Sequence, residues 1–122
     1  MSKPKILDIW LKICLEKLWK LNINSEEINI SELKNNLDIP YLEKEWTDDW
    51  NLTPRMLIEN FDNEVSHKTK VLKANLIYPI EIYNNKWKWI ILDWVHRFVK
   101  LIQSWEKIIK VRKVSKDDLE KI

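Results

Sequence analysis

The chain contains no glycine, and this absence limits the turns that it can make. Among its 122 residues are eight tryptophans and no glycine, whereas glycine averages about 7% of residues in soluble proteins. Glycine adopts positive φ without steric cost, so many tight turns and helix ends use it. A fold built from this chain must therefore avoid such corners or place larger residues in them.

The length and the charge balance indicate one compact domain, over 1–122, with no strong bias toward a polyanion. Lys and Arg number 21 against 19 Asp and Glu, so the net charge of +2 does not by itself point to nucleic acid or an anionic membrane. No apolar run approaches the roughly 18 residues of a membrane span. The N-terminus lacks a signal-peptide pattern, and the single Cys14 cannot form an internal disulfide. These features predict a cytoplasmic protein.

The first half and middle of the chain are predicted to be rich in helix. Apolar residues recur at helical spacing near the N-terminus, and Thr53 followed by Pro54 matches an N-cap and the first position of a helix. The expected elements are a helix over 5–20, a short strand over 27–30, a helical turn over 31–37, a loop over 41–52, and helices over 53–60 and 63–74.

The last third changes to the two-residue periodicity of strands. Runs 78–83 and 88–92 are separated by "NNKW", which stands where a hairpin turn belongs. A helix over 95–104 and a strand over 107–114 follow, and Ser115 with Asp118 resembles a capping box that starts a short closing helix. The sequence therefore predicts a single α+β domain, with an α-rich N-terminal half and a small mixed sheet in the C-terminal half.

The stretch "WIILDWVHRFVK" (89–100) is the strongest candidate for a binding site. It reads as a strand, a turn and a helix start, and a helix N-terminus attracts anions through its free N–H groups and its dipole. Arg97 could contact a phosphate through two N–H groups, and His96 could donate a hydrogen bond. Asp93 could cap the helix or hold a metal that bridges phosphates. The alternative is structural: Asp93 only caps, Arg97 is a surface cation and His96 is partly buried.

The segment "YPIEIYNNKWKWIILDWVHRFVKLIQSWEKIIKVRKV" resembles the ParB/sulfiredoxin-like superfamily. That family shows an apolar-Pro-Ile strand, a glycine turn, a strand, Asp-Gly-x-His-Arg at a helix start, a helix, a glycine and a final strand. The resemblance spans about 74–114, with "INISEL" similar to the family's first strand. The whole chain resembles small stand-alone ParB-like proteins.

The resemblance implies a nucleotide or phosphate site at Asp93, Trp94, Val95, His96 and Arg97. In relatives (CTP-binding partition proteins, sulfiredoxins and a free-serine kinase group) this loop contacts nucleotide phosphates, so ATP, ADP or CTP with Mg²⁺ is the implied ligand. Val95 stands where sulfiredoxins carry their catalytic cysteine, so sulfinic-acid reduction is not expected. The implied function is nucleotide binding, with hydrolysis or phosphoryl transfer as a further step and enzymatic activity left open. The alternative is a non-enzymatic DNA-associated or regulatory module.

Other residues give weaker signals. Arg55 is a candidate second phosphate contact. Asp48 and Asp49 lie in an acidic loop that could bind a metal or supply a general base, or could simply be solvated. A basic run could follow a nucleic-acid backbone with weak, non-specific affinity, or could keep an edge strand soluble. The run consists of Lys107, Lys110, Arg112, Lys113 and Lys116. His67, among polar residues, is predicted to be a surface histidine, no metal ligand is assigned, and the oligomeric state stays open.

Several tryptophans occupy positions where glycine is expected. Trp87 falls in the hairpin turn, Trp94 in the Asp-Gly-x-His-Arg turn, and Trp105 just past a helix; Trp46 is a weaker case. We hypothesise that these residues stand for glycines, through a codon that one genetic code reads as tryptophan and a variant code reads as glycine. The alternative is a natural chain that is rich in tryptophan and free of glycine. A chain that carries Trp94 is predicted to bind phosphate poorly.

Overall fold

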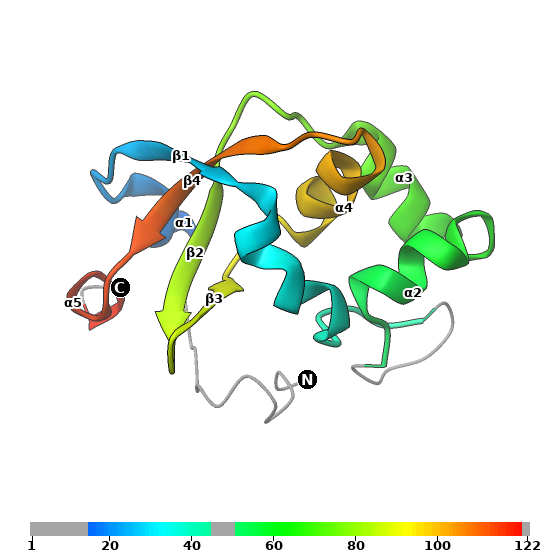
Figure 1. The fold of residues 1–122 in the computed structure, drawn as a ribbon, viewed down its shortest axis with the longest axis horizontal. Coiled ribbons are helices and arrows are strands. Elements are labelled where there is room, and N and C mark those ends of the chain that lie inside the picture. Colours follow the sequence, from blue (N-terminus) through cyan, green and yellow to red (C-terminus); the bar gives the residue numbers. More distant parts are fainter. Residues whose placement is uncertain (1–14, 45–50, 121–122) are drawn as a thin grey trace.

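The computed structural model describes residues 15–44 and 51–120, which form a mixed α+β fold around a four-stranded sheet (Figure 1). The elements in chain order are α1 (Leu15–Lys20), β1 (Ser25–Asn29), the 3₁₀ helix η2 (Ile30–Asp38), α2 (Pro54–Glu59), the 3₁₀ turn η3 (Phe61–Asn63), α3 (Val65–Lys73), β2 (Ile80–Asn85), β3 (Lys88–Ile91), α4 (Val95–Gln103), β4 (Ile108–Val114) and α5 (Lys116–Glu120). The predicted α+β class and the β-β-α-β order of the last third are confirmed. In Figure 1, α2, α3 and α4 gather at one side of the sheet and α5 lies at the opposite end.

The sheet has the order β1-β4-β2-β3 and mixes both kinds of pairing. β1 and β4 are antiparallel, β2 and β3 form an antiparallel hairpin, and β2 and β4 are parallel. Parallel neighbours need a crossover, which β3 and α4 provide. Because β4 lies between two strands, the prediction that the lysines of its basic run protect an exposed edge is wrong.

The larger apolar core fills the space between one face of the sheet and the helices. Strands contribute alternate residues to this face, whereas η2, α2 and α3 contribute one buried residue each and α4 contributes three. The buried members include Ile28, Leu33, Leu57, Val71, Ile80, Ile82, Ile91, Phe98, Val99, Ile109 and Val111. This packing holds α4, and therefore the predicted site at its N-terminus, against the sheet.

A smaller cluster covers the other face. Leu18 of α1 packs on Ile90, Leu92 and Val114, with Leu119 of α5 beside them. Because both faces of the sheet are covered, residues of β2 that alternate outward from the main core are buried as well. Glu81 is such a residue, because it lies on the second face and is only 3% exposed.

The free edge of β3 is closed by side chains from the η2 region. The Ile91 amide donates to Asn36 Oδ1 at 3.0 Å and to the Tyr41 hydroxyl at 2.9 Å, while Asn36 Nδ2 donates to the Trp89 carbonyl at 2.8 Å. Asn36 and Tyr41 are buried, so these bonds satisfy groups that water cannot reach. Burial raises the pKa of Tyr41 well above its usual value, which keeps its hydroxyl protonated.

Local capping signals in the sequence are confirmed. Thr53 Oγ1 accepts from the Met56 amide at 3.1 Å and Pro54 opens α2. Ser115 Oγ accepts from the Asp118 amide, and Asp118 Oδ2 accepts from the Ser115 amide, both at 3.0 Å. This reciprocal pair is a capping box with Asp at the fourth position. Of the helix predicted over 5–20, only Leu15–Lys20 lies within the described residues, and η2 is a 3₁₀ helix where a helical turn was predicted.

Within 15–44 and 51–120, no helix combines the length and apolar character that a membrane crossing requires.

Candidate functional site at the start of α4

The turn between β3 and α4 has a left-handed residue at its corner. Trp94 is the N-cap of α4 with φ 74° and ψ 37°, and its side chain makes no capping hydrogen bond. Its carbonyl accepts from the Phe98 amide at 3.0 Å, which starts the helix. The corner therefore has the backbone of a glycine turn, while the first amides of α4 receive no side-chain cap from Trp94.

Positive φ occurs at four places in the described part of the chain: Lys86 (52°), Trp87 (70°), Trp94 (74°) and Trp105 (58°). Lys86 and Trp87 form the two-residue hairpin turn between β2 and β3, and Trp105 follows the end of α4. The prediction that positions 87, 94 and 105 require a glycine-like backbone is thus confirmed for all three. Trp46 lies outside the described residues.

The Asp93 carboxylate accepts two hydrogen bonds, one within the turn and one from α1. Its Oδ1 accepts from the Trp94 amide at 2.8 Å, and its Oδ2 accepts from Trp19 Nε1 at 2.8 Å. The Trp19 ring, from α1, also stacks on the Trp94 ring with centroids 5.4 Å apart and planes at 20°. α1 therefore contacts the turn, although Trp19 and Asp93 are 74 positions apart in the sequence. Nothing in the sequence around Trp19 indicated this contact.

Arg97 is buried beneath the Trp94 ring. Its guanidinium carbon lies 4.1 Å from the centre of that ring and 5.7 Å from the centre of the Tyr78 ring. Its Nη1 donates to the Pro79 carbonyl at 2.9 Å, but Nε has no hydrogen-bond partner although Arg97 is only 4% exposed. Burial lowers the pKa of Arg97, and the nearby carboxylates of Glu81 and Asp93 oppose that shift. The prediction of a surface cation, as the structural alternative had it, is wrong.

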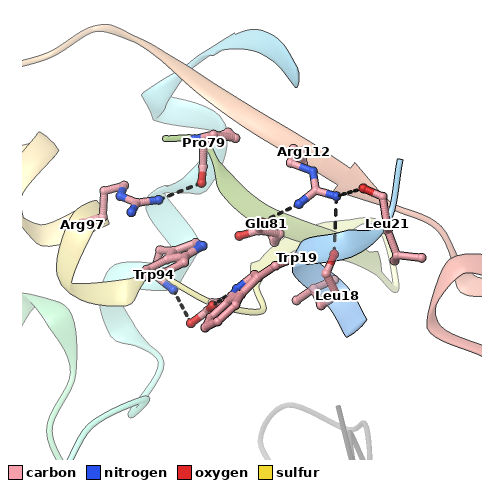
Figure 2. A network of polar contacts seen from close by, with 9 residues as sticks. Leu18, Trp19, Leu21, Pro79, Glu81, Trp94, Arg97 and Arg112 are labelled. Atoms are coloured by element: carbon pink, nitrogen blue, oxygen red, sulfur yellow. Dashed lines mark hydrogen bonds and ion pairs between the residues drawn. The ribbon is translucent and has the colours of Figure 1, made fainter. Parts of the chain in front are cut away.

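A second buried arginine, Arg112 of β4, lies close by (Figure 2). Arg112 Nη1 donates to Glu81 Oε1 at 2.9 Å, and Nη2 donates to the carbonyls of Leu18 and Leu21 at the end of α1. Glu81 Oε2 has no partner, and burial raises the pKa of Glu81 while Arg112 opposes the rise. Figure 2 shows Glu81 between Arg112 and the pair formed by Trp94 and Arg97. By fixing α1, Arg112 holds Trp19 on the turn.

His96 points to α3. Its Nε2 lies 2.8 Å from His67 Nδ1, and His67 Nε2 lies 2.6 Å from the Glu43 carbonyl oxygen. A carbonyl only accepts, so His67 Nε2 carries the proton, and the neutral pair then requires His96 Nε2–H to donate to His67 Nδ1. The ring centroids are 5.1 Å apart with planes at 21°, as expected for two imidazoles joined edge to edge. The predicted surface role of His67 is wrong, since it is half-buried in this chain of bonds.

This pairing removes His96 Nε2 as a donor to a ligand. Burial is the main cause that lowers the pKa of His96 to about 4, and the nearby His67 and Lys70 act in the same direction. His96 is therefore neutral near pH 7, with its Nδ1 lone pair as the remaining polar function. A neutral imidazole with this tautomer contributes no N–H to a phosphate.

The remaining predicted residues are distributed as follows. Val95 is half-buried at the first position of α4 and packs against the main core. Arg55 lies on α2, where Nε donates to Asp38 Oδ1 at 2.8 Å and Nη2 donates to Asp38 Oδ2 at 3.2 Å, in an exposed ion pair. Asp48 and Asp49 lie outside the described residues. The structure thus brings 93–97 together and adds Trp19, Tyr78 and Glu81, whereas Arg55 is engaged elsewhere.

The donor set in the turn does not form a dedicated metal site. Within the described ranges, no group of three or more His, Cys, Asp or Glu side chains could hold a metal ion together. Asp93, the only carboxylate of the turn, is committed to two hydrogen bonds. Mg²⁺ commonly arrives with the phosphates of its ligand and keeps several waters.

Comparison with known proteins identifies no relative. No protein-family model, no curated protein and no solved structure matches this chain. The likeness to the ParB/sulfiredoxin-like superfamily stays a prediction from the sequence.

Proposed function

We propose that the fold of this chain provides a site for a nucleotide or a similar phosphate-bearing ligand at 93–97, and that the Trp94 indole obstructs this site so that the Trp94 chain binds weakly. The observation that supports the proposal is the state of Arg97. Its guanidinium is buried at the N-terminus of α4 with Nε unsatisfied and one face covered by the indole 4.1 Å away. A buried cation with an unused donor, beside a helix N-terminus, is suited to an anion.

Binding is better supported than catalysis. Phosphoryl transfer relies mainly on positioning and charge stabilisation, which Arg97 and the amides of α4 would supply in part. A hydrolase or phosphotransferase also needs a group that orients or deprotonates the nucleophile. His96, with a pKa lowered to about 4, is a weak base near neutrality, and Asp93 is bonded to Trp19 and Trp94. We therefore propose a binding protein, with a reaction as a further possibility to be measured.

The test is a nucleotide panel on matched variants. CTP, ATP and ADP with Mg²⁺ are titrated by calorimetry and thermal shift into the Trp94 chain, Trp94→Gly, Trp94→Ala and the double variant Trp94→Gly/Arg97→Met. We expect little binding by the Trp94 chain, binding by Trp94→Gly, weaker binding by Trp94→Ala because its Cβ disfavours the corner, and loss in the double variant. Phosphate release from the nucleotide, measured on the same samples, reports any hydrolysis. If no nucleotide raises the melting temperature of Trp94→Gly, the proposal is wrong.

One further variant, Lys110→Gln, distinguishes nucleotide binding from the DNA-associated alternative. The basic run does not form one exposed strip, because Arg112 is buried against Glu81, and Lys113 pairs with Glu26 at 3.4 Å and lies over the Trp89 ring. Salt-dependent binding to random DNA that is lost in Lys110→Gln, with no nucleotide binding by Trp94→Gly, would favour that alternative.

A further inference from the structure

Three tryptophans of this chain share a backbone conformation that their side chain does not explain. Trp87, Trp94 and Trp105 are three of the four residues with positive φ among residues 15–44 and 51–120. We propose that these three positions carry glycine in the protein as its source makes it. The inference rests on backbone conformation and exposure, and it is independent of whether the turn binds a nucleotide.

The left-handed region is costly for a residue with a Cβ. Non-glycine residues with positive φ are mostly Asn and Asp, and a bulky residue there is an outlier. The chain has suitable residues at hand, since Asn84 and Asn85 directly precede the hairpin turn, yet tryptophan stands at the second turn position. In a two-residue hairpin turn with positive φ at both positions, this second position is the one that most favours glycine.

Packing does not compensate for the conformation at two of the three corners. Trp87 is 95% exposed and Trp105 is 90% exposed. An exposed indole gains little from burial, so burial does not offset the cost of positive φ at these two corners. Trp105 follows the end of α4, and its amide donates to the Ile102 carbonyl at 3.1 Å while the Glu106 amide donates to the Leu101 carbonyl at 3.2 Å. This pair of bonds is the pattern of a helix C-terminus that ends on a left-handed residue, most often glycine.

The other described tryptophans behave differently. Trp19 lies in α1 and Trp89 in β3, both without positive φ. Each has a specific partner: Trp19 Nε1 donates to Asp93, and Lys113 Nζ lies 5.2 Å from the centre of the Trp89 ring. The described tryptophans thus divide into a group that a helix or strand accommodates and a group at glycine corners. Trp10, Trp46 and Trp50 lie outside the described residues.

A difference in how one codon is translated would produce these two groups of tryptophans. If one codon is read as glycine in the source and as tryptophan under another genetic code, every glycine written with that codon appears as tryptophan, and ordinary tryptophan codons are unaffected. At position 94, glycine would remove the indole that covers the Arg97 guanidinium and stacks on Trp19. The first amides of α4 and one face of Arg97 would then be open to a ligand.

The gene and the native protein provide the direct test. We expect the codons at 87, 94 and 105 to be identical to one another and different from the codons at 19 and 89. Peptide mass spectrometry of the protein isolated from its source should show the mass of glycine at all three positions. A common, ordinary tryptophan codon at 19, 87, 89, 94 and 105, or a native peptide with the mass of tryptophan at 87 or 105, would overturn the proposal.

A stability comparison tests the backbone requirement on the recombinant chain. Trp87→Gly and Trp105→Gly are each compared with Trp87→Ala and Trp105→Ala by urea unfolding. Both substitutions remove the indole, and only glycine removes Cβ, so the difference isolates the cost of positive φ. We expect glycine to raise the folding equilibrium constant about tenfold over alanine at each site. The control Trp89→Gly, in a strand, should instead be less stable than Trp89→Ala. Alanine as stable as glycine at both 87 and 105 would overturn the proposal.

Discussion

Arg97 and Arg112 are both buried, yet the protein uses them in opposite ways. Arg112 is 8% exposed and makes one bond to Glu81 and two to the carbonyls at the end of α1. Arg97 is 4% exposed, makes one bond to the Pro79 carbonyl and leaves Nε unsatisfied beneath the Trp94 ring. The protein supplies three hydrogen bonds to the first guanidinium and one to the second, whose Nε has no partner.

The difference in hydrogen bonding indicates that Arg112 has a structural role, whereas Arg97 has an N–H group that no protein atom uses. A buried charge is tolerated when it is paired and hydrogen-bonded, as Arg112 is with Glu81 and two carbonyls. Arg97 retains donor capacity beside a helix N-terminus, where an anion would complete it. The basic run in the sequence includes Arg112, which is paired with Glu81, and excludes Arg97, so the charge pattern did not indicate which arginine lacks partners.

The largest effect is expected from Arg112→Met. This change leaves the Glu81 carboxylate buried without its counter-ion and frees the carbonyls of Leu18 and Leu21, so we expect a loss of about 3–5 kcal/mol in the free energy of unfolding. Urea unfolding measures it. The double variant Glu81→Gln/Arg112→Met should recover part of the loss, because no unpaired charge remains. A loss below about 1 kcal/mol in the single variant would remove the distinction between the two arginines.

A smaller effect is expected from acid titration of His96, on the side of α4 that faces α3. The pKa of His96 is lowered to about 4 in the folded chain, mainly by burial, with His67 and Lys70 adding to the shift. The unfolded chain binds this proton near pH 6.5, so the contribution is complete above pH 6.5 and is lost as the pH falls toward 4. We expect a loss of about 2–3 kcal/mol across this window.

Matched variants assign that pH dependence. His96→Gln keeps a side-chain N–H for His67 and should remove most of the slope between pH 6.5 and 4, measured by urea unfolding at a series of pH values. His67→Gln should remove only part of it, since burial of His96 is the larger cause. An unchanged slope in His96→Gln would show that another group titrates.

Arg97→Met is expected to have a modest effect on stability. Only one hydrogen bond to the Pro79 carbonyl is lost, and an incompletely satisfied buried charge is removed with it, so we expect a change within about 1 kcal/mol. The functional effect should be much larger: in the Trp94→Gly background, nucleotide affinity should fall at least about tenfold. A stability loss as large as that of Arg112→Met would place Arg97 among the structural residues.

The smallest effect is expected at the exposed pair of Arg55 and Asp38. Arg55 lowers the pKa of Asp38 through a hydrogen bond, but both groups are solvated, and such pairs contribute little. Asp38→Asn should leave the urea midpoint unchanged within error. It should also leave nucleotide binding by Trp94→Gly unchanged, because the ion pair of Arg55 with Asp38 involves no residue of the turn at 93–97. A drop in affinity in Arg55→Gln, or a rise in Asp38→Asn, which frees Arg55 from its carboxylate partner, would restore Arg55 as the second phosphate contact that the sequence suggested.

Features of short range were predictable from the sequence. The alternation of β2, the Thr53 cap, the Ser115 and Asp118 capping box and the glycine-like corners at 87, 94 and 105 all depend on neighbouring residues. Each follows from local sterics or a hydrogen bond within a few residues, so the order of amino acids determines it directly. The location of a candidate site at the start of α4 followed for the same reason.

Only the tertiary structure decided what the charged and imidazole side chains do. The bond from Arg97 to the Pro79 carbonyl, the pairing of Glu81 with Arg112, the bond from His96 to His67 and the contact of Trp19 with Asp93 each join residues that are 18 or more positions apart. Glu81 is buried because both faces of the sheet are covered. The local sequence pattern does not indicate how many faces are covered. The sequence determined the corners of the chain; the packing of helices on both faces of the sheet determined which buried polar groups are hydrogen-bonded within the protein and which have no partner.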